Sequence, residues 1–456
     1  MTALWTSEEA QGATLGIPSK IFEVNGLSID TRTLRKDDLF VALKGENRDG
    51  HAFVKSAFEA GAGAALVTHR PAELPPSAAL LTVANTQRAL EDLAVAARAR
   101  SDAKIIAVTG SAGKTTTKEI LRIALGALGK THASAASYNN HWGVPLSLAS
   151  LPRDARYGVF EIGMNHFGEI RSLVGFVRPH VALVTTIAPA HLEFFGTCEA
   201  IADAKSEIFE GIAPGGAALV PADSPYAERL VARARQARVS RILRFGGKAG
   251  CDARLVEYAE TETGSLVRAD ICGTPVEFRI GAPGRHVAEN AVAALLAIAV
   301  SDGDVLNAAA ALREFSALKG RGARFRSGGV DVIDESYNAN PASMAAALTL
   351  LGAAKGRRIA VLGDMLEMGP DGAAHHADLA TPIAAARADL VFLCGSQMKG
   401  LWDRLPPAQR GGCAASSAEL APLLVKSLHS GDTVLVKGSL GSKMAVIIDA
   451  LKARDA

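Results

Sequence analysis

Short, strongly apolar runs recur through the middle of the chain, and stretches with helical periodicity separate them. The runs cover residues 105–108, 158–162 and 181–186. Such runs are typical of strands that are buried on both faces of a parallel sheet. Residues 240–280 then alternate between polar and apolar, and residues 288–300 have the pattern of a helix. This order predicts an α/β fold whose mostly parallel sheet has an antiparallel edge.

The same alternation returns in the last third of the chain. Strands are expected at residues 330–333, 359–362, 390–393 and 433–436, and a helix at 341–351. Strands that alternate with helices favour a doubly wound, Rossmann-like sheet, in which functional loops follow the carboxyl ends of the strands. The preceding stretch Lys-Gly-Arg-Gly, residues 319–322, is typical of a hinge.

The part of the chain before residue 103 has strand-like runs at 39–43, 64–67 and 80–83. A proline-rich stretch, 71–76, predicts a loop, and residues 86–100 predict a closing helix. A chain of 456 residues is too long for a single hydrophobic core. We therefore expect three domains: a small α/β domain over 1–102, a central phosphate-loop domain over 103–318, and a Rossmann-like domain over 319–456.

Composition narrows the class of protein. Hydrophobic residues make up 48% and charged residues 21%, while the formal net charge is only +2. So small a charge argues against binding to nucleic acid. The most apolar window, 291–300, is too short to span a bilayer, and residues 1–9 lack the basic start of a signal peptide. We expect a cytoplasmic protein without membrane insertion, monomeric by default.

The cysteines add no chemistry to this picture. There are five, scattered along the chain at Cys198, Cys251, Cys272, Cys394 and Cys413. No pair has the spacing of metal ligands or of a redox motif. We expect small buried residues of a protein from a reducing compartment.

The run from Thr109 to Thr116, Thr-Gly-Ser-Ala-Gly-Lys-Thr-Thr, lies between a predicted strand and a predicted helix. Small residues let backbone N–H groups point at phosphate oxygens, and the helix N-terminus adds a positive dipole. Lys114 supplies a cation and Thr115 a hydroxyl for Mg²⁺. We expect ATP to bind at Gly110, Ser111, Ala112, Gly113, Lys114, Thr115 and Thr116. A chance Gly-Lys-Thr is the alternative, since the first glycine of the common G-x-x-x-x-G-K-[ST] pattern would fall on Val108.

A site that uses ATP also needs hard ligands for a metal ion at the ends of neighbouring strands. Glu161 is an acid inside an apolar strand-like run, and His191 follows another such run. The alternatives are an edge-strand carboxylate that faces water and a structural histidine. Lys205 lies in a stretch with helical periodicity, and the simplest interpretation is that it belongs to the solvent-exposed face of that helix.

Four motifs accompany the loop. They are Tyr-Asn-Asn-His-Trp-Gly-Val-Pro at 138–145, Glu-Ile-Gly-Met-Asn-His-Phe-Gly-Glu-Ile at 161–170, Ser-Tyr-Asn-Ala-Asn-Pro at 336–341 and Gly-Asp-Met-Leu-Glu-Met-Gly at 363–369. With them, the loop resembles the T-G-[ST]-x-G-K-T-T signature of the Mur ligases, the ATP-dependent amide-forming enzymes of peptidoglycan precursor synthesis. The resemblance covers the whole chain in the same order. It is greatest to the member that joins D-alanyl-D-alanine to UDP-N-acetylmuramoyl-tripeptide.

The resemblance implies a two-step reaction, in which ATP phosphorylates the terminal carboxylate of the tripeptide and the amine of the dipeptide then attacks. It assigns Lys114 to the transferred phosphate, and Thr115 and Glu161 to one Mg²⁺. His191 would ligate a second Mg²⁺. Lys205 matches a lysine that is carbamylated in the family and so gives the second ion a carboxylate. Carbamylation needs a neutral amine and therefore a lowered pKa.

The remaining assignments also come from matched motifs. His286 and Asn290 match the G-x-H-x-x-x-N element, whose asparagine faces adenine. Arg321 matches a hinge arginine near the ATP phosphates, and Glu335 an acid at the ribose. Contacts to the substrates are expected from Ser28, Asp30, Arg32, Asn139, Asn140, Asn338, Asn340, Asp364 and Lys437. The alternatives are a surface ion pair in the first domain and ordinary turn residues in the third.

Three other functions stay open at this point. The preceding Mur ligase, which adds the third amino acid, usually carries a D-N-P-R element that this chain lacks. Folylpolyglutamate synthase shares the ATPase core but has no matching uridine-nucleotide domain. A nucleotide-gated binding protein would use ATP only to switch its conformation.

Overall fold

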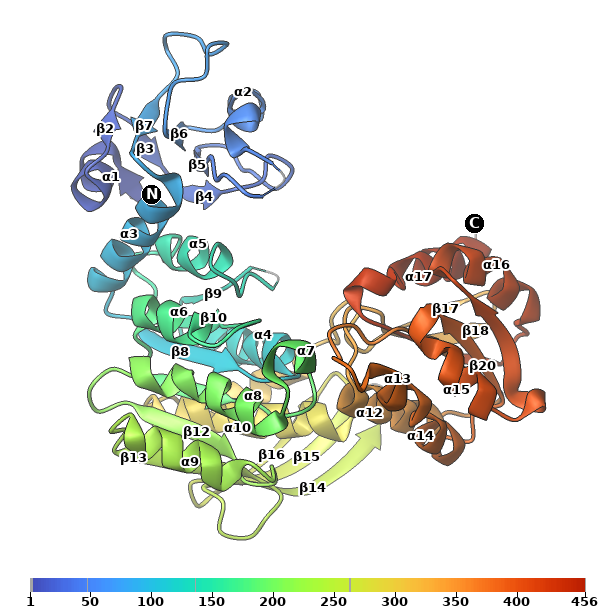
Figure 1. Ribbon diagram of the computed structural model, residues 1–456. Coiled ribbons are helices and arrows are strands. Elements are labelled where there is room, and N and C mark those ends of the chain that lie inside the picture. The colour runs from blue at the N-terminus through green and yellow to red at the C-terminus, as the bar shows by residue number, and fades with distance from the viewer. Residues whose placement is uncertain (1–2, 47, 136, 262–263, 456) are drawn as a thin grey trace.

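The computed structural model describes residues 3–46, 48–135, 137–261 and 264–455. Residues 1–2 and 456, at the ends of the first and third predicted domains, lie outside these ranges, as do residues 262–263 of the predicted antiparallel region. The chain forms three α/β units in sequence order (Figure 1). The first unit stands on the central one, and the third lies to the side of the central one.

The first unit contains a five-stranded sheet in the order β2-β7-β6-β5-β4. Only β2 and β7 run antiparallel in it. Its strands are β2 (Ile17–Pro18), β4 (Gly26–Ser28), β5 (Asp38–Val41), β6 (Ala64–Val67) and β7 (Leu80–Thr82). The ribbon of β1 (Trp5–Thr6) and β3 (Glu23–Val24) and the helices α1 (Ser7–Thr14), α2 (Val54–Glu59) and α3 (Thr86–Ala99) complete the unit.

The central unit contains a nine-stranded sheet in the order β16-β15-β14-β13-β12-β11-β8-β10-β9. The strands from β9 to β14 are parallel, and β15 and β16 continue as an antiparallel edge, as the sequence predicts. The strands are β8 (Lys104–Thr109), β9 (Thr131–Ala133), β10 (Tyr157–Glu161), β11 (Val181–Val184), β12 (Ala217–Pro221), β13 (Arg241–Gly246), β14 (Ala253–Thr261), β15 (Gly264–Ile271) and β16 (Thr274–Ile280). The helices are α4 (Lys114–Gly126), α5 (Gly143–Ala149), α6 (Glu169–Val177), α7 (Leu192–Phe195), α8 (Cys198–Ser206), α9 (Ala227–Gln236), α10 (Arg285–Val300) and α11 (Val305–Ala311).

The third unit contains a six-stranded sheet in the order β17-β18-β22-β19-β20-β21, parallel except between β17 and β18. The strands are β17 (Ala323–Ser327), β18 (Val330–Glu335), β19 (Arg358–Gly363), β20 (Leu390–Cys394), β21 (Arg410–Ala414) and β22 (Thr433–Lys437). The helices are α12 (Pro341–Gly352), α13 (Gly372–Ala377), α14 (Ala380–Ala385), α15 (Lys399–Arg404), α16 (Ser417–Ser427) and α17 (Ala445–Lys452). The four strands predicted here are confirmed as its central strands.

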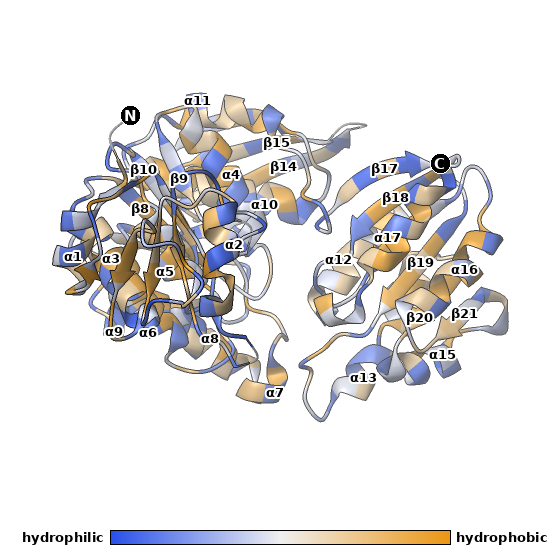
Figure 2. Cartoon of the chain, turned by 90° about the horizontal axis from the view of Figure 1, so that it is seen from above, coloured by the Kyte–Doolittle hydropathy of each residue, from blue (hydrophilic) through white to orange (hydrophobic). Residues whose placement is uncertain are grey.

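Apolar residues gather on the strands and on the inner faces of the helices (Figure 2). One continuous core joins α1 and α3 of the first unit to α5, α6 and one face of the central sheet. The other face of that sheet packs on α4 and on the nearly all-apolar α10. No helix in the described part of the chain is long and apolar enough to cross a membrane.

The expectation for the cysteines is only partly correct. All five are free, but Cys394 alone is buried. Cys272 is exposed because it forms the turn between β15 and β16, and Cys413 is exposed on the edge strand β21. An edge strand and a hairpin turn leave side chains open to solvent, which the residue type alone does not reveal.

Candidate active site

A cleft of about 1260 Å³ opens where the carboxyl ends of the central strands face the third unit. The loop after β8 forms its floor. Gly110 has φ +152°, and a Cβ there would lie 1.9 Å from Thr185 Oγ1. Gly113, at φ +82°, lies against the Asn290 side chain, where a Cβ would come within 3.0 Å. The glycines therefore allow a close approach of backbone that other residues would prevent.

The segment that follows β11 fixes the shape of this loop. The N–H of Ser111 donates to Thr186 O at 2.9 Å, and Thr185 Oγ1 donates to Ala112 O at 2.5 Å. The side chain of Lys114 donates to Gly110 O at 2.8 Å and so lies folded across the loop. Thr185, which the sequence predicted only as part of a strand, thus holds this loop in place. The loop thus presents a preformed cradle at the start of α4, suited to phosphate.

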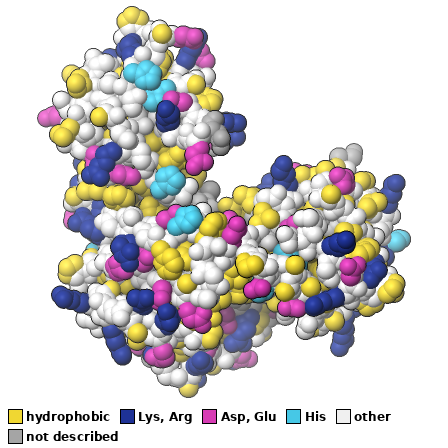
Figure 3. All heavy atoms as spheres, viewed as in Figure 1, with side chains coloured by type: hydrophobic (Ala, Val, Ile, Leu, Met, Phe, Trp, Pro, Cys, Tyr) yellow, Lys and Arg dark blue, Asp and Glu magenta, His cyan; other side chains and the backbone are white. Residues whose placement is uncertain are grey.

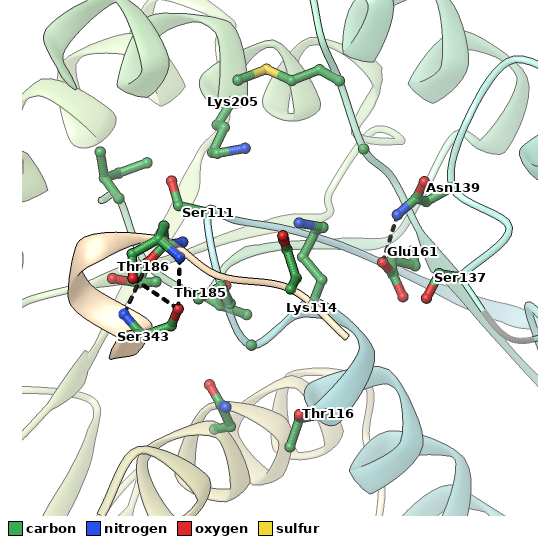
Figure 4. Close-up of a pocket in the computed structure, with 18 of the residues that line it drawn as sticks. Ser111, Lys114, Thr116, Ser137, Asn139, Glu161, Thr185, Thr186, Lys205 and Ser343 are labelled. Carbon is green, nitrogen blue, oxygen red and sulfur yellow. Dashed lines mark hydrogen bonds between the residues drawn. The ribbon is translucent and has the colours of Figure 1, made fainter. Parts of the chain in front are cut away.

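Glu161 ends β10, which lies between β8 and β9 and is therefore not an edge strand. The alternative of a glutamate in water is wrong, because the residue is only 1% exposed. Thr115 Oγ1 donates to Oε2 at 2.9 Å, and Asn139 Nδ2 donates to Oε1 at 2.7 Å. Figure 4 shows Asn139 and Glu161 beside Lys114. A buried carboxylate with only neutral donors can hold a cation.

Two lysines share the cleft. Lys205, on α8, is 1% exposed, so the interpretation as a solvated face is wrong. Burial, with the nearby charge of Lys114, holds the pKa of Lys205 well below the ordinary value of an amine. Burial also lowers the pKa of Lys114, where the charge of Glu161 opposes the shift. Figure 4 shows the two amines reaching into the same space from the loop and from α8. Lys205 is thus the amine that most readily loses its proton there.

A second buried acid, Glu207, holds the segment after Glu161 in place. Glu207, directly after α8, accepts hydrogen bonds from the N–H groups of Gly168 and Arg171. These N–H groups open α6, where a carboxylate also meets the positive end of the helix dipole. The helix that carries Lys205 and the loop after Glu161 are therefore tied together.

His191 precedes α7 and adopts φ +59°. Its Nδ1 contacts Oε2 of Glu367, which belongs to the third unit. This contact lowers the pKa of Glu367, so the carboxylate stays ionised. The imidazole also lines the cleft. Glu367 lies in a motif of the sequence, but nothing in its spacing showed that it would meet His191.

Arg321 crosses from the hinge to the central unit. Its Nη2 donates to Ser137 Oγ at 3.3 Å, and its guanidinium lies 4.0 Å from the ring centre of Tyr337. Asp334, 2% exposed, accepts from the N–H of Gly320 at 2.9 Å and so anchors the hinge to β18. Sequence reasoning missed Ser137, Tyr337 and Asp334, because their roles depend on contacts between distant segments. The hinge places its arginine in the cleft.

The cleft also lies between α10 and the ends of two strands of the third unit. His286 and Asn290 line it from α10, opposite Glu335. Lys437, 2% exposed, donates to Glu335 Oε2 at 3.2 Å and to Asn338 O at 2.9 Å. The acid expected at the ribose therefore already has a cationic partner.

The expected substrate residues divide into two groups. Asn139, Asn140, Asn338, Asn340 and Lys437 line the cleft. Asn340 also caps α12 through a bond from the Ser343 N–H, so part of its role is structural. Ser28, Asp30, Arg32 and Asp364 do not line it.

Local contacts explain where the second group lies. Asp30 and Arg32 form an ion pair at the surface of the first unit, and the Arg32 side chain is 86% exposed. Ser28 Oγ donates to the carbonyl of Asp30 and so shapes the same turn. Asp364 directly follows β19 and is buried, and this burial raises the pKa of its carboxyl. A position after a strand predicted the correct edge of the sheet for Asp364 but not its orientation.

The donors fit Mg²⁺ only in part. Within the described ranges, no three His, Cys, Asp or Glu residues gather as a metal-binding cluster. Thr115 and Glu161 supply hard oxygen donors. His191 lines the cleft with its imidazole, and Lys205 offers an amine, which a metal does not accept while it is protonated. One oxygen-rich position is present, and a second would need Lys205 to carry an oxygen ligand.

Comparison with known proteins agrees with this arrangement. The family model "Mur ligase middle domain" matches residues 108–298, "Mur ligase, glutamate ligase domain" matches 320–440, and "Mur ligase family, catalytic domain" matches 23–125. The crystal structure of MurF from Acinetobacter baumannii superposes with a TM-score of 0.86 at 31% identity, over 98% of this chain and 99% of that one. MurF from Thermotoga maritima in complex with ADP superposes with a TM-score of 0.78 at 24% identity, over 94% and 97%. The predicted three-domain α/β architecture is confirmed.

Sequence comparison reaches the same family independently of the fold. The UDP-N-acetylmuramoyl-tripeptide–D-alanyl-D-alanine ligase of Rickettsia prowazekii is 33% identical over 448 residues, which are 98% of this chain and 99% of that protein. Such identity over nearly the full length of both proteins shows, together with the three family models, that the chain belongs to the Mur ligase family.

Proposed function

We propose that the chain joins D-alanyl-D-alanine to UDP-N-acetylmuramoyl-tripeptide, with cleavage of ATP to ADP and phosphate. The product is the UDP-linked pentapeptide used in peptidoglycan synthesis. Curated relatives of similar identity share the name of this ligase. Their agreement favours this reaction over the addition of the third amino acid and over a nucleotide-gated switch.

One observation carries the chemistry: the cleft brings a phosphate loop together with Lys114, Arg321 and the buried Glu161. A carboxylate is a poor acyl donor, so its oxygen first attacks the γ-phosphorus of ATP and ADP leaves. The amine of the dipeptide then attacks the acyl carbon, loses a proton and expels phosphate. Negative charge builds on the phosphoryl and acyl oxygens in both steps. Cations fixed in a partly dry cleft stabilise such charge without further reorganisation.

We assign the parts of the nucleotide to two sets of residues in the cleft. Residues 110–116 would hold the phosphates, with Lys114 at the γ-phosphate. Asn290 would face the adenine, and His286 and Glu335 would lie beside the ribose. All three line the cleft. The complex of the Thermotoga protein with ADP supports a nucleotide in this fold.

Mg²⁺ would be held by Thr115 and Glu161, and a second ion by His191 and Lys205. Bound there, the ions would neutralise phosphate charge and orient the γ-phosphate for transfer. For Lys205 we propose carbamylation, in which the neutral amine adds to the carbon of CO₂ and releases a proton, which leaves a negatively charged carbamate. Burial favours this, since it lowers the pKa of Lys205 and so favours the neutral amine.

The first unit would bind the uridine nucleotide through the turn with Ser28, Asp30 and Arg32. The tripeptide would then reach the cleft past Asn139 and Asn140. On the side of the third unit, the substrates would be contacted by Asn338, Asn340, Asp364 and Lys437. A reaction that uses ATP and a UDP-linked substrate favours the cytoplasm. We keep the domain limits 1–102, 103–318 and 319–456 and the monomeric state as part of this proposal.

Release of ADP in the presence of each substrate alone and of both tests the reaction. We expect release only when UDP-muramoyl-tripeptide and D-alanyl-D-alanine are both present, with one pentapeptide formed per ADP. Lys114→Ala should abolish turnover, because it removes the cation at the transferred phosphate. Lys130→Ala is the matched control, since Lys130 is an exposed lysine paired with Asp154. ADP release that ignores the peptide substrates would contradict the proposal.

The carbamate has its own test. Enzyme equilibrated with ¹³C-labelled CO₂ should show one carbamate carbon signal by NMR, which Lys205→Ala lacks. The same variant should lose activity, and bicarbonate should not restore it, whereas a short-chain carboxylate should restore part. A spectrum of the wild-type enzyme without the signal contradicts carbamylation.

A further inference from the structure

The short helix α7 of the central unit lies against the loop 364–372 of the third unit. His191 Nδ1 contacts the Glu367 carboxylate, and the N–H of Glu193 donates to the carbonyl of Glu367 at 3.2 Å. Leu192, between them, packs against the apolar core of the third unit. A Cβ on Gly369 would come within 3.3 Å of the backbone of Glu193. One side of the imidazole is therefore held by a different domain from the one that carries it.

Both ends of this contact have an unusual backbone conformation. His191 has φ +59° and Glu367 has φ +62°. For residues with a Cβ, this left-handed conformation costs about 1–2 kcal/mol. Two such residues in direct contact indicate a local geometry that the surrounding structure imposes.

The loop that presents Glu367 is itself well ordered by side-chain contacts. His376, fully buried on α13, accepts from the N–H of Met365 through Nε2 at 2.8 Å. Its Nδ1 lies 2.6 Å from Gly372 O and, with Nε2 an acceptor, donates to it. The N–H of Leu366 donates to Ser439 Oγ at 2.9 Å. Glu367 is thus presented on a fixed frame.

We propose that Glu367 is a positioning residue for His191. Its carboxylate keeps the imidazole proton on Nδ1 and leaves the lone pair of Nε2 free for the cleft. His191 Nδ1 lies in direct contact with Oε2 of Glu367, and a carboxylate oxygen can only accept the imidazole proton there. Histidines that ligate metals commonly offer their second nitrogen to a carboxylate, which fixes the ring and raises its basicity.

This inference rests on the proposed function, in which His191 ligates the second metal ion. It adds that the third unit contributes to a site whose other ligands come from the central unit. The second ion should therefore bind more tightly when the third unit is docked on α7. By reciprocity, binding of the ion should favour docking to the same degree.

Binding of Mn²⁺ as a probe, followed by electron paramagnetic resonance with ADP present and no turnover, tests the role of Glu367. Glu367→Ala should lower the affinity for the second Mn²⁺ by about 10- to 100-fold. Glu367→Gln should lose less, because its amide oxygen still accepts from Nδ1. Leu366→Ala is the matched control, since this exposed side chain of the same loop should leave Mn²⁺ binding unchanged. In a His191→Ala background, Glu367→Ala should have no further effect.

Unchanged Mn²⁺ affinity in Glu367→Ala would overturn the inference. So would an equal loss of Mn²⁺ affinity when Glu367→Ala is made in the His191→Ala variant. A second measurement does not depend on the variants: ¹⁵N NMR of the wild-type histidines should find neutral His191 protonated at Nδ1. Protonation at Nε2 would overturn the inference as well. The variants can weaken the second Mn²⁺ as expected while the wild-type enzyme shows no ligase turnover. In that case the proposed function fails and the role of Glu367 stands.

Discussion

The central unit has two neighbours and holds them in different ways. Against the first unit it shares one hydrophobic core, across which Trp5 Nε1 donates to Ala149 O at 2.9 Å. Arg98, on α3, donates to the carbonyls of Val177 and Arg178 at 2.9 Å. Against the third unit, no described pair of helices or strands packs extensively. The contacts there include the Arg321 hinge, Leu192, and the contacts of His191 and Glu193 with Glu367.

Figure 3 shows the consequence as a recess between the first and third units, with the third attached only to the side of the central one. Burial of apolar surface stabilises the first interface, while polar groups of the active site form the second. We infer that the first two units move as one body and that the third opens and closes the cleft. Changes at the first interface should therefore cost stability, and changes at the second should cost catalysis.

The largest expected effect is that of Trp5→Ala at the first interface. Trp5 is 1% exposed, and the guanidinium of Arg100 lies 3.7 Å from its ring centre. Loss of a buried tryptophan costs about 3–5 kcal/mol of unfolding free energy. Chemical denaturation measures this loss, and turnover per folded molecule should stay within about twofold. Ile21→Ala, at an exposed position of the same unit, should change stability by about 0.5 kcal/mol at most. A large loss of turnover in folded Trp5→Ala would break the comparison.

The next largest effect is expected at the second interface, where a substitution should lower catalysis and leave stability nearly unchanged. Arg321→Ala should lower kcat by about 100- to 1000-fold, the usual cost of a lost donor to transition-state charge. Its unfolding temperature should stay near that of the wild type, because the side chain covers no shared core. Arg326→Ala is the control, since Arg326 is an exposed arginine of β17. A stability loss as large as that of Trp5→Ala would mean that the two interfaces are alike.

A smaller effect tests whether the third unit unfolds on its own. Asp432, 3% exposed, accepts from Arg357 and from the N–H of His429 within that unit, and these donors keep the pKa of its carboxyl below the ordinary value despite burial. Asp432→Asn should cost about 1.5–3 kcal/mol at pH 7. In calorimetry, only the transition of the third unit should shift. Because the folded pKa is lowered, the contribution is complete above about pH 3.9 and is lost as pH falls through the folded pKa. A single shifted transition for the whole chain would contradict independent unfolding.

The sequence predicted most of the strands, because parallel sheets need continuous apolar runs that are visible without any partner. It also predicted the phosphate loop, since the glycines and Lys114 are neighbours in the chain. It could not place Lys205 in the core, because helical periodicity does not show what packs on α8. The contacts of Glu367 with His191 and of Asp334 with the hinge join distant segments, so no local pattern reveals them. Asp364 follows a strand as expected, yet loop geometry turns it away from the cleft.

The most direct test of the central claim is to follow the oxygen of the activated carboxylate. Tripeptide substrate labelled with ¹⁸O at its terminal carboxylate is incubated with the enzyme, ATP and D-alanyl-D-alanine, and the phosphate is analysed by mass spectrometry. Attack of that carboxylate on the γ-phosphorus predicts one ¹⁸O atom in each phosphate released and one pentapeptide formed with it. Phosphate that carries no ¹⁸O would contradict an acyl phosphate and, with it, the role assigned to the cleft.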